Sequence, residues 1–96
     1  MKFAAVIEYT PDAAKASELR PTHRQYLREL LGRGQLVAAG PFGDGSGALI
    51  VYEAASAEEA EGLLRGDPFH AAGVFVRWQL RPWSPALANR DLLPGG

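Results

Sequence analysis

Residues 35–53, QLVAAGPFGDGSGALIVYE, decide the fold, because they hold two apolar segments separated by a glycine-rich turn. Segment 43–47, GDGSG, supplies residues that adopt positive φ at no steric cost, as a tight hairpin requires. A phosphate-binding loop would instead lead into the N-terminus of a helix. We therefore expect a hairpin between a strand over residues 35–42 and a strand over residues 48–53.

Two further strands flank this hairpin along the chain. Lys2–Tyr9 is short and rich in aliphatic residues, and a turn signal, Thr-Pro-Asp, follows it. Residues 74–82 have the same character near the end of the chain. The sequence thus predicts four strands in total.

One helix is expected on each side of the hairpin. From Pro21 to Arg33 leucines recur at helical spacing, and a break is predicted near Arg20 because proline is best tolerated in the first helical turn. Ser56 and Glu59 form a capping box that opens the second helix, which the sequence Gly-Asp-Pro at 66–68 ends.

The predicted order strand, helix, strand, strand, helix, strand is typical of an α+β fold of ferredoxin-like plan. In this βαββαβ arrangement both helices cover one face of a four-stranded antiparallel sheet. Phe3 and Ile7 would point to one face and Val6 to the other, so both faces carry apolar residues. We expect the uncovered face to pack against a second copy in a homodimer. Residues 1–96 form one domain in this interpretation, with a C-terminal tail over residues 84–96.

Composition limits the partners and the compartment. Ten basic and eleven acidic residues give a net charge of -1, which provides no attraction for nucleic acid or for an anionic membrane. The absence of cysteine excludes disulfides and thiolate chemistry and favours the reducing cytosol. The N-terminus lacks the pattern of a signal peptide. We expect a cytoplasmic protein whose ligand is a small molecule.

His23 is the first candidate for chemistry. It shares a helical face with Leu27 and Leu30, so its ring is directed toward the core. Burial and the positive end of the helix both disfavour the imidazolium, which predicts a neutral ring able to act as a general base. A core histidine bonded to a backbone carbonyl explains the same pattern.

Asp67 is the second candidate, because it follows the second helix, where the helix dipole disfavours a carboxylate. An ordinary Asp-Pro turn is the alternative. If the two helices lie side by side on the sheet, Asp67 can approach His23.

Other side chains could bind a substrate. Arg20 could hold an anionic group or be solvated. Aromatic residues along the strands could line a pocket or belong to the core; they are Phe42, Tyr52, Phe69, Phe75 and Trp78. His70 is the only other histidine, and no metal site is expected from two histidines without ligand spacing.

Three segments together resemble the YCII-related family: RPTHRQYL at 20–27, AAGPFGDGSGALIVYEA at 38–54 and GDPFHAAGVF at 66–75. The resemblance spans nearly the whole chain but not the tail. It implies a ferredoxin-like fold assembled as a dimeric α/β barrel. It also implies that His23 and Asp67 form a catalytic pair and that Arg20 lines the pocket.

The resemblance leaves the reaction open. The family includes a cofactor-free dehydrochlorinase of a chlorinated hydroxyquinol, and the wider superfamily includes muconolactone isomerase and cofactor-free monooxygenases. One hypothesis is a small enzyme without a cofactor, in which His23 moves a proton on a compact aromatic or enol-forming molecule and Asp67 orients the ring. The alternatives are a non-catalytic module that binds a metabolite and a purely structural dimer.

Overall fold

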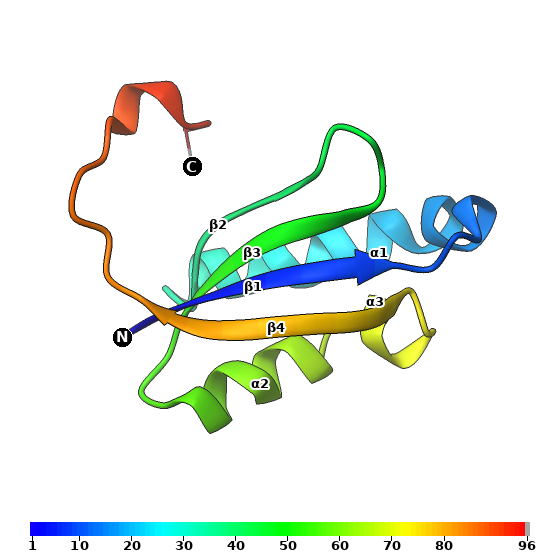
Figure 1. The fold of residues 1–96 in the computed structure, drawn as a ribbon, viewed down its shortest axis with the longest axis horizontal. Helices are drawn as coiled ribbons and strands as arrows, with labels where there is room; N and C mark the ends of the chain where they lie inside the picture. Colours follow the sequence, from blue (N-terminus) through cyan, green and yellow to red (C-terminus); the bar gives the residue numbers. More distant parts are fainter. Residues whose placement is uncertain (96) are drawn as a thin grey trace.

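A four-stranded antiparallel sheet forms the centre of the structure, a computed structural model that describes residues 1–95. Its order is β2-β3-β1-β4 (Figure 1). The strands are β1 (Lys2–Tyr9), β2 (Leu36–Pro41), β3 (Gly47–Glu53) and β4 (Phe75–Trp83). β1 lies in the middle and pairs with both β3 and β4. The predicted α+β fold of ferredoxin-like plan is confirmed, and each strand lies within two residues of its expected bounds.

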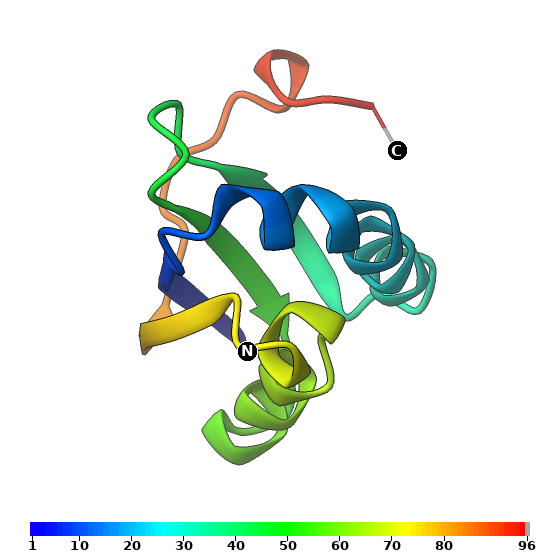
Figure 2. The ribbon, with the colours of Figure 1, turned by 90° about the vertical axis from the view of Figure 1, so that its right-hand side faces the viewer.

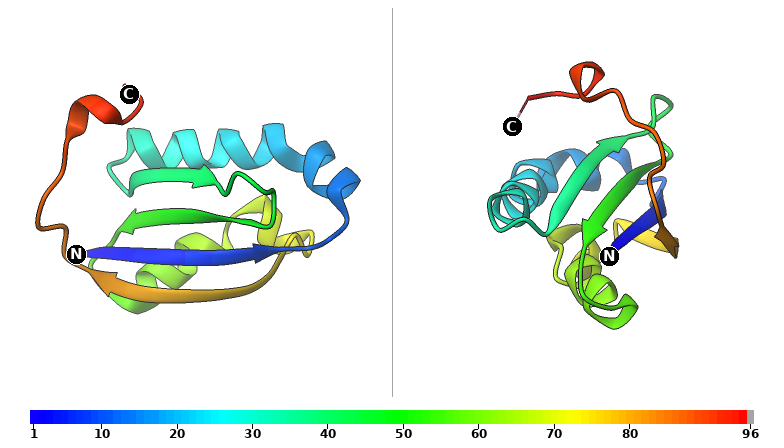
Figure 3. Two further views of the ribbon diagram at one scale, coloured as in Figure 1. Left: turned by 45° about the horizontal axis from the view of Figure 1, so that its top comes forward. Right: turned by 90° about the vertical axis from the view of Figure 1, so that its left-hand side faces the viewer.

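All three helices lie on one face of the sheet (Figures 2 and 3). They are α1 (Ala13–Gly32), α2 (Ala57–Arg65) and α3 (Pro68–Ala71). Between helices and sheet lies the core, which includes Phe3, Ile7, Ile50, Tyr52 and Leu64, each at most 1% exposed. On the other face Val6 and Leu49 are partners across β1 and β3, and they are 50% and 41% exposed. The sheet therefore has one covered face and one face with exposed apolar side chains.

Helix α1 is longer than the sequence predicted. It begins at Ala13 and continues through Pro21, so the predicted break near Arg20 was wrong. The Asp12 side chain accepts a hydrogen bond from the Lys15 backbone N–H at 3.1 Å and caps the first turn. Ala16 is buried in the core, so packing in these early turns offsets the hydrogen bond lost at Pro21. The early turns lie at an angle to the rest of the helix (Figure 3).

A short third helix, α3, was not predicted. Helix α2 opens as expected, with Ser56 Oγ accepting the Glu59 backbone N–H at 3.1 Å. After α2 ends, Asp67 caps α3 by accepting the Phe69 backbone N–H at 2.9 Å, and Pro68 occupies the first helical turn. The expectation of an unfavourable helix dipole at Asp67 was wrong, because this carboxylate lies where a helix begins.

The tail after β4 extends away from the sheet and passes over toward α1 (Figures 1 and 2). It contains a single 3-10 turn at Arg90–Leu92 and exposes Leu87 almost completely, at 95%. Within residues 1–95 no helix has the length and the apolar character needed to cross a membrane.

Gly47 at the start of β3 provides a stability test. A Cβ at this position would lie 1.8 Å from the backbone oxygen of Ile7, so β1 and β3 would have to separate. We expect Gly47→Ala to lower the free energy of unfolding by about 1–3 kcal/mol, the usual cost of overpacking, as measured by urea denaturation. Gly43→Ala is the matched control, because nothing lies within 4 Å of its added Cβ. Equal stability of the two variants would contradict the tight β1–β3 contact.

Candidate active site

The two residues singled out for chemistry are in direct contact. His23 Nδ1 lies 2.8 Å from both carboxylate oxygens of Asp67. Asp67 is fully buried and His23 is 6% exposed. The carboxylate also accepts the Phe69 backbone N–H, so it has partners from α1 and from α3. Since a carboxylate only accepts hydrogen bonds, Nδ1 donates, and the lone pair of the neutral ring lies on Nε2.

The position of His23 differs from the expected one. Because α1 begins at Ala13, His23 lies in the middle of this helix and not in its first turns. The positive end of the helix therefore does not act on the imidazole. The charge that faces this ring at hydrogen-bond distance is the carboxylate of Asp67.

A wall of aromatic rings fixes the orientation of the imidazole. The Phe69 ring stacks on the His23 ring with a centroid distance of 4.0 Å and an interplanar angle of 5°. Phe75 meets the imidazole edge-on at 6.1 Å, and Tyr9 meets Phe69 edge-on at 5.5 Å. Ring packing on one side and the carboxylate on Nδ1 leave His23 little freedom to rotate.

A cavity of about 960 Å³ lies beside the pair, between α1, β2 and the end of the tail. His23, Arg20, Tyr9 and Phe42 contribute to its lining. The structure thus brings three of the residues predicted from the sequence, His23, Arg20 and Phe42, to one cavity, with Asp67 directly behind the histidine.

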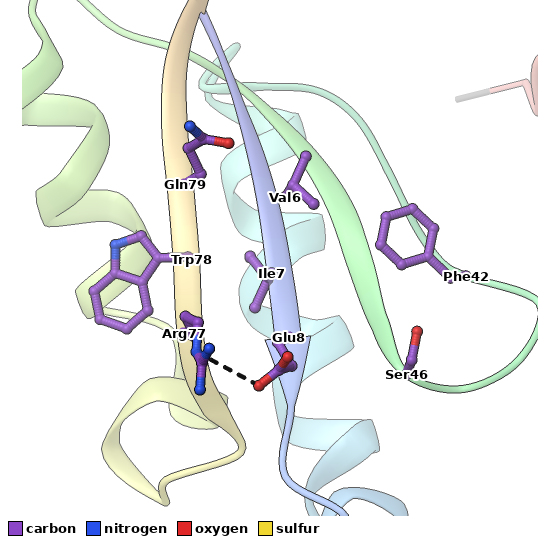
Figure 4. A pocket seen from close by; sticks show the side chains of 8 residues that line it. All are labelled: Val6, Ile7, Glu8, Phe42, Ser46, Arg77, Trp78 and Gln79. Carbon is purple, nitrogen blue, oxygen red and sulfur yellow. Dashed lines mark ion pairs between the residues drawn. The ribbon is translucent and has the colours of Figure 1, made fainter.

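Two predicted ligand-binding residues lie elsewhere. Phe69 is fully buried and lies behind the imidazole, so it supports His23 and does not line the cavity. Trp78 points toward α2 (Figure 4), where its ring lies 5.4 Å from the His70 ring and 5.3 Å from the Arg65 guanidinium. Neither residue contacts the space beside His23.

A second cavity, of about 540 Å³, lies on the sheet face without helices (Figure 4). Val6, Phe42 and Gln79 line it, and Arg77 lies 3.7 Å from Glu8 at its end. Phe42 borders both cavities, because it lies at the edge of the sheet after β2.

Tyr9 is the residue that the sequence analysis missed. It is the last residue of β1, lines the larger cavity and contacts the ring that supports His23. Burial, followed by the charge of Asp67, raises the pKa of Tyr9, while Arg20 and Arg24 act in the opposite direction. A phenol with a raised pKa remains protonated and can donate a hydrogen bond. The sequence offered one signal for Tyr9. It ends β1 in alternation with Phe3 and Ile7, whose side chains face the core, so its own side chain was expected on the helix-covered face.

The charge of Asp67 also acts on two deeper phenols. Burial and then Asp67 raise the pKa of both Tyr26 and Tyr52. Tyr26 donates to the backbone oxygen of Leu63 at 2.7 Å. The Tyr52 hydroxyl is buried and has no hydrogen-bond partner in the described part of the chain.

No cluster of three potential metal ligands occurs among residues 1–95. His70 is separate from the His23 pair and lies 3.5 Å from a guanidinium nitrogen of Arg65.

Fold and site together define a ferredoxin-like α+β protein with a buried histidine–aspartate pair beside a cavity. Residues 1–84 match the profile of the YCII-related domain, and the chain belongs to this family. A comparison with curated protein sequences finds no significant match.

A solved structure with the same fold is 5-chloro-2-hydroxyhydroquinone dehydrochlorinase (TftG) from Burkholderia phenoliruptrix AC1100, in complex with 2,5-dihydroxybenzoquinone. The TM-score is 0.76 at 23% sequence identity, over 88% of this chain and 94% of the other. This similarity confirms the fold.

The shared influence of Asp67 on the phenols can be measured. We expect Asp67→Asn to lower the pKa of Tyr9 and Tyr26, because removal of the negative charge removes one cause of each upward shift. Ultraviolet absorbance titration of tyrosinate reports the change. Asp44→Asn is the control, since Asp44 is exposed in the hairpin loop and is not among the causes of those shifts. Identical titrations of wild type and Asp67→Asn would contradict this electrostatic coupling.

Proposed function

We propose that this protein is a small enzyme that moves a proton on a compact aromatic or enol-forming molecule without a cofactor. The observation that carries the proposal is the buried contact of His23 with Asp67 at the wall of the 960 Å³ cavity. When Nδ1 of a histidine is hydrogen-bonded to a carboxylate, its Nε2 can exchange protons with a substrate, which is the arrangement used in general acid–base catalysis.

In the proposed mechanism Nε2 of His23 takes a proton from the substrate. Asp67 holds the ring in the tautomer that keeps the lone pair on Nε2, and its charge stabilises the imidazolium that forms. The substrate becomes an enolate or phenolate, whose developing negative charge lies in the cavity. Tyr9 can donate a hydrogen bond to it and Arg20 can provide a positive charge, since both line the same space. The imidazolium then returns the proton to another atom of the substrate.

The substrate class follows from the cavity and from the structural relative. Apolar side chains, including Leu27, Leu36 and Phe42, make up much of the lining, as expected for a site that holds an aromatic or similar skeleton. The relative of the same fold was solved with 2,5-dihydroxybenzoquinone, a compact ring that carries enolic hydroxyl groups. We propose a substrate of comparable size and chemistry for this chain.

We also propose that the protein acts as a homodimer in which two sheets pack face to face. The half-exposed pair Val6 and Leu49 lies on the face that no helix covers. Burial of apolar surface contributes roughly 25 cal/mol per Å², so two such faces stabilise one another when they pack together. The second cavity lies on this face and would be closed by the partner sheet.

Proton transfer by His23 can be tested with 2,5-dihydroxybenzoquinone as the probe. We expect the protein to accelerate the exchange of its ring C–H protons with D₂O, which ¹H NMR follows. In this exchange the deuterated imidazolium of His23 gives a deuteron to a ring carbon of the enolate, and the neutral imidazole then removes the proton from the same carbon. His23→Gln should reduce the enzymatic rate by about 100-fold or more, the usual contribution of a general base. Circular dichroism checks that the variant is folded.

His70→Gln is the matched control, because it removes the other histidine, which lies outside the cavity. It should leave the exchange rate unchanged. If His23→Gln and His70→Gln both retain full rate, the assignment of the base is wrong. Binding of the probe without any acceleration of exchange would instead make the protein a ligand-binding module.

The dimer has its own test. Sedimentation analysis of the wild type should give twice the 10.3 kDa mass of the chain. Val6→Glu should give a monomer, because a charge placed in the sheet interface would be desolvated without a partner. Leu87→Glu introduces the same charge in the exposed tail and should leave the dimer intact. A wild-type monomer at micromolar concentration would contradict the proposed assembly.

A further inference from the structure

Three arginines line the larger cavity from a single helix. Arg20, Arg24 and Arg28 follow one another at four-residue intervals along α1, and each contributes to the lining. An α-helix turns by roughly 100° per residue. Measured around the axis of α1 from His23, Arg20 therefore lies at about 60°, Arg24 at about 100° and Arg28 at about 140°, all on the same side. The arginines therefore form a row along one side of α1, with steps of about 6 Å along the axis.

The charge of this row is not compensated locally. No Asp or Glu is among the described residues that line the cavity. None of the three arginines has an ion-pair partner in residues 1–95, whereas Arg65 pairs with Glu61 and Arg77 pairs with Glu8. The whole chain has a net charge of -1, so three positive charges around one cavity are a local excess.

The remaining lining is mainly apolar. Leu27 lies between Arg24 and Arg28 on α1, Leu31 follows them one turn later, and residues 36–42 form another wall. A cavity with apolar walls and a row of guanidinium groups suits a ligand with an apolar body and an anionic group. The planar fork of arginine matches the two oxygens of a carboxylate.

We propose that the substrate of this site carries a carboxylate, which Arg24 and Arg28 bind, while its ring or enol lies at His23. This inference rests on the proposed function and adds the chemical class of the substrate. Arg24 and Arg28 are about one turn apart, so both guanidinium groups can reach one carboxylate. Arg20 lines the cavity together with Tyr9, so it is available for charge that develops on the ring.

The experiment compares 2,5-dihydroxybenzoate with its neutral methyl ester as binding probes, by isothermal titration calorimetry or NMR titration. Wild type should bind the carboxylate at least about tenfold more tightly than the ester, and this preference should shrink as salt concentration rises. The double variant Arg24→Gln, Arg28→Gln should lose the preference for the carboxylate and retain the affinity for the ester.

Arg33→Gln is the matched control, because Arg33 is exposed at the end of α1 and does not line the cavity. It should bind both probes like the wild type. Equal affinity for acid and ester, an equal loss of both in the double variant, or no binding of either at millimolar concentration would overturn the proposal.

This test is separable from the test of the proposed function. Preferential binding of the carboxylate with no His23-dependent proton exchange would support the arginine site and reject the enzyme. Exchange that depends on His23 but shows no preference for an anionic probe would support the enzyme and reject the carboxylate site.

Discussion

The fully buried carboxylate of Asp67 is the constraint on which the site depends. A carboxylate in the core must have hydrogen-bond partners, and the loss of one partner of a buried polar group costs about 1–3 kcal/mol, or more where the group is charged. His23 from α1 and the Phe69 backbone N–H from α3 provide these partners. The carboxylate thus connects the first helix to the segment after the second helix, 44 residues away in sequence. This connection sets the position of the imidazole before any ligand is bound.

The fold was largely predictable because its signals are local. Alternation along β1 and β3, the glycine-rich turn between β2 and β3, and the capping box of α2 each depend on neighbouring residues. The errors arose where tertiary contacts override local preference. Proline disfavours a helix interior, but the Asp12 cap and the burial of Ala16 extend α1 through Pro21. Asp-Pro indicated a turn, but the same pair opens α3.

The candidate site was predictable to a different degree at each position. His23 and Asp67 were identified from their residue types and from short motifs, whereas their contact depends on how α1 and α3 pack. Phe69 and Trp78 were expected in a pocket, but residue type does not reveal depth or direction. One lies behind the imidazole and the other faces α2. Tyr9 was read as part of a strand because its neighbours along β1 belong to the core.

The same contacts that stabilise this end of the core also determine which chemistry it can perform. Asp67 occupies Nδ1 of His23, so Nε2 is the nitrogen available for proton transfer. Burial, followed by the charge of Asp67, raises the pKa of Tyr9, so its phenol remains a hydrogen-bond donor. The arginine row adds positive charge to the lining of the cavity that His23 also lines, whereas the buried carboxylate is not part of that lining. A negative charge that forms on a bound molecule would therefore face donors and cations, while the proton that it loses moves toward the carboxylate side. This separation of charge is the physical reason why a histidine in this position is suited to remove a proton from a small molecule.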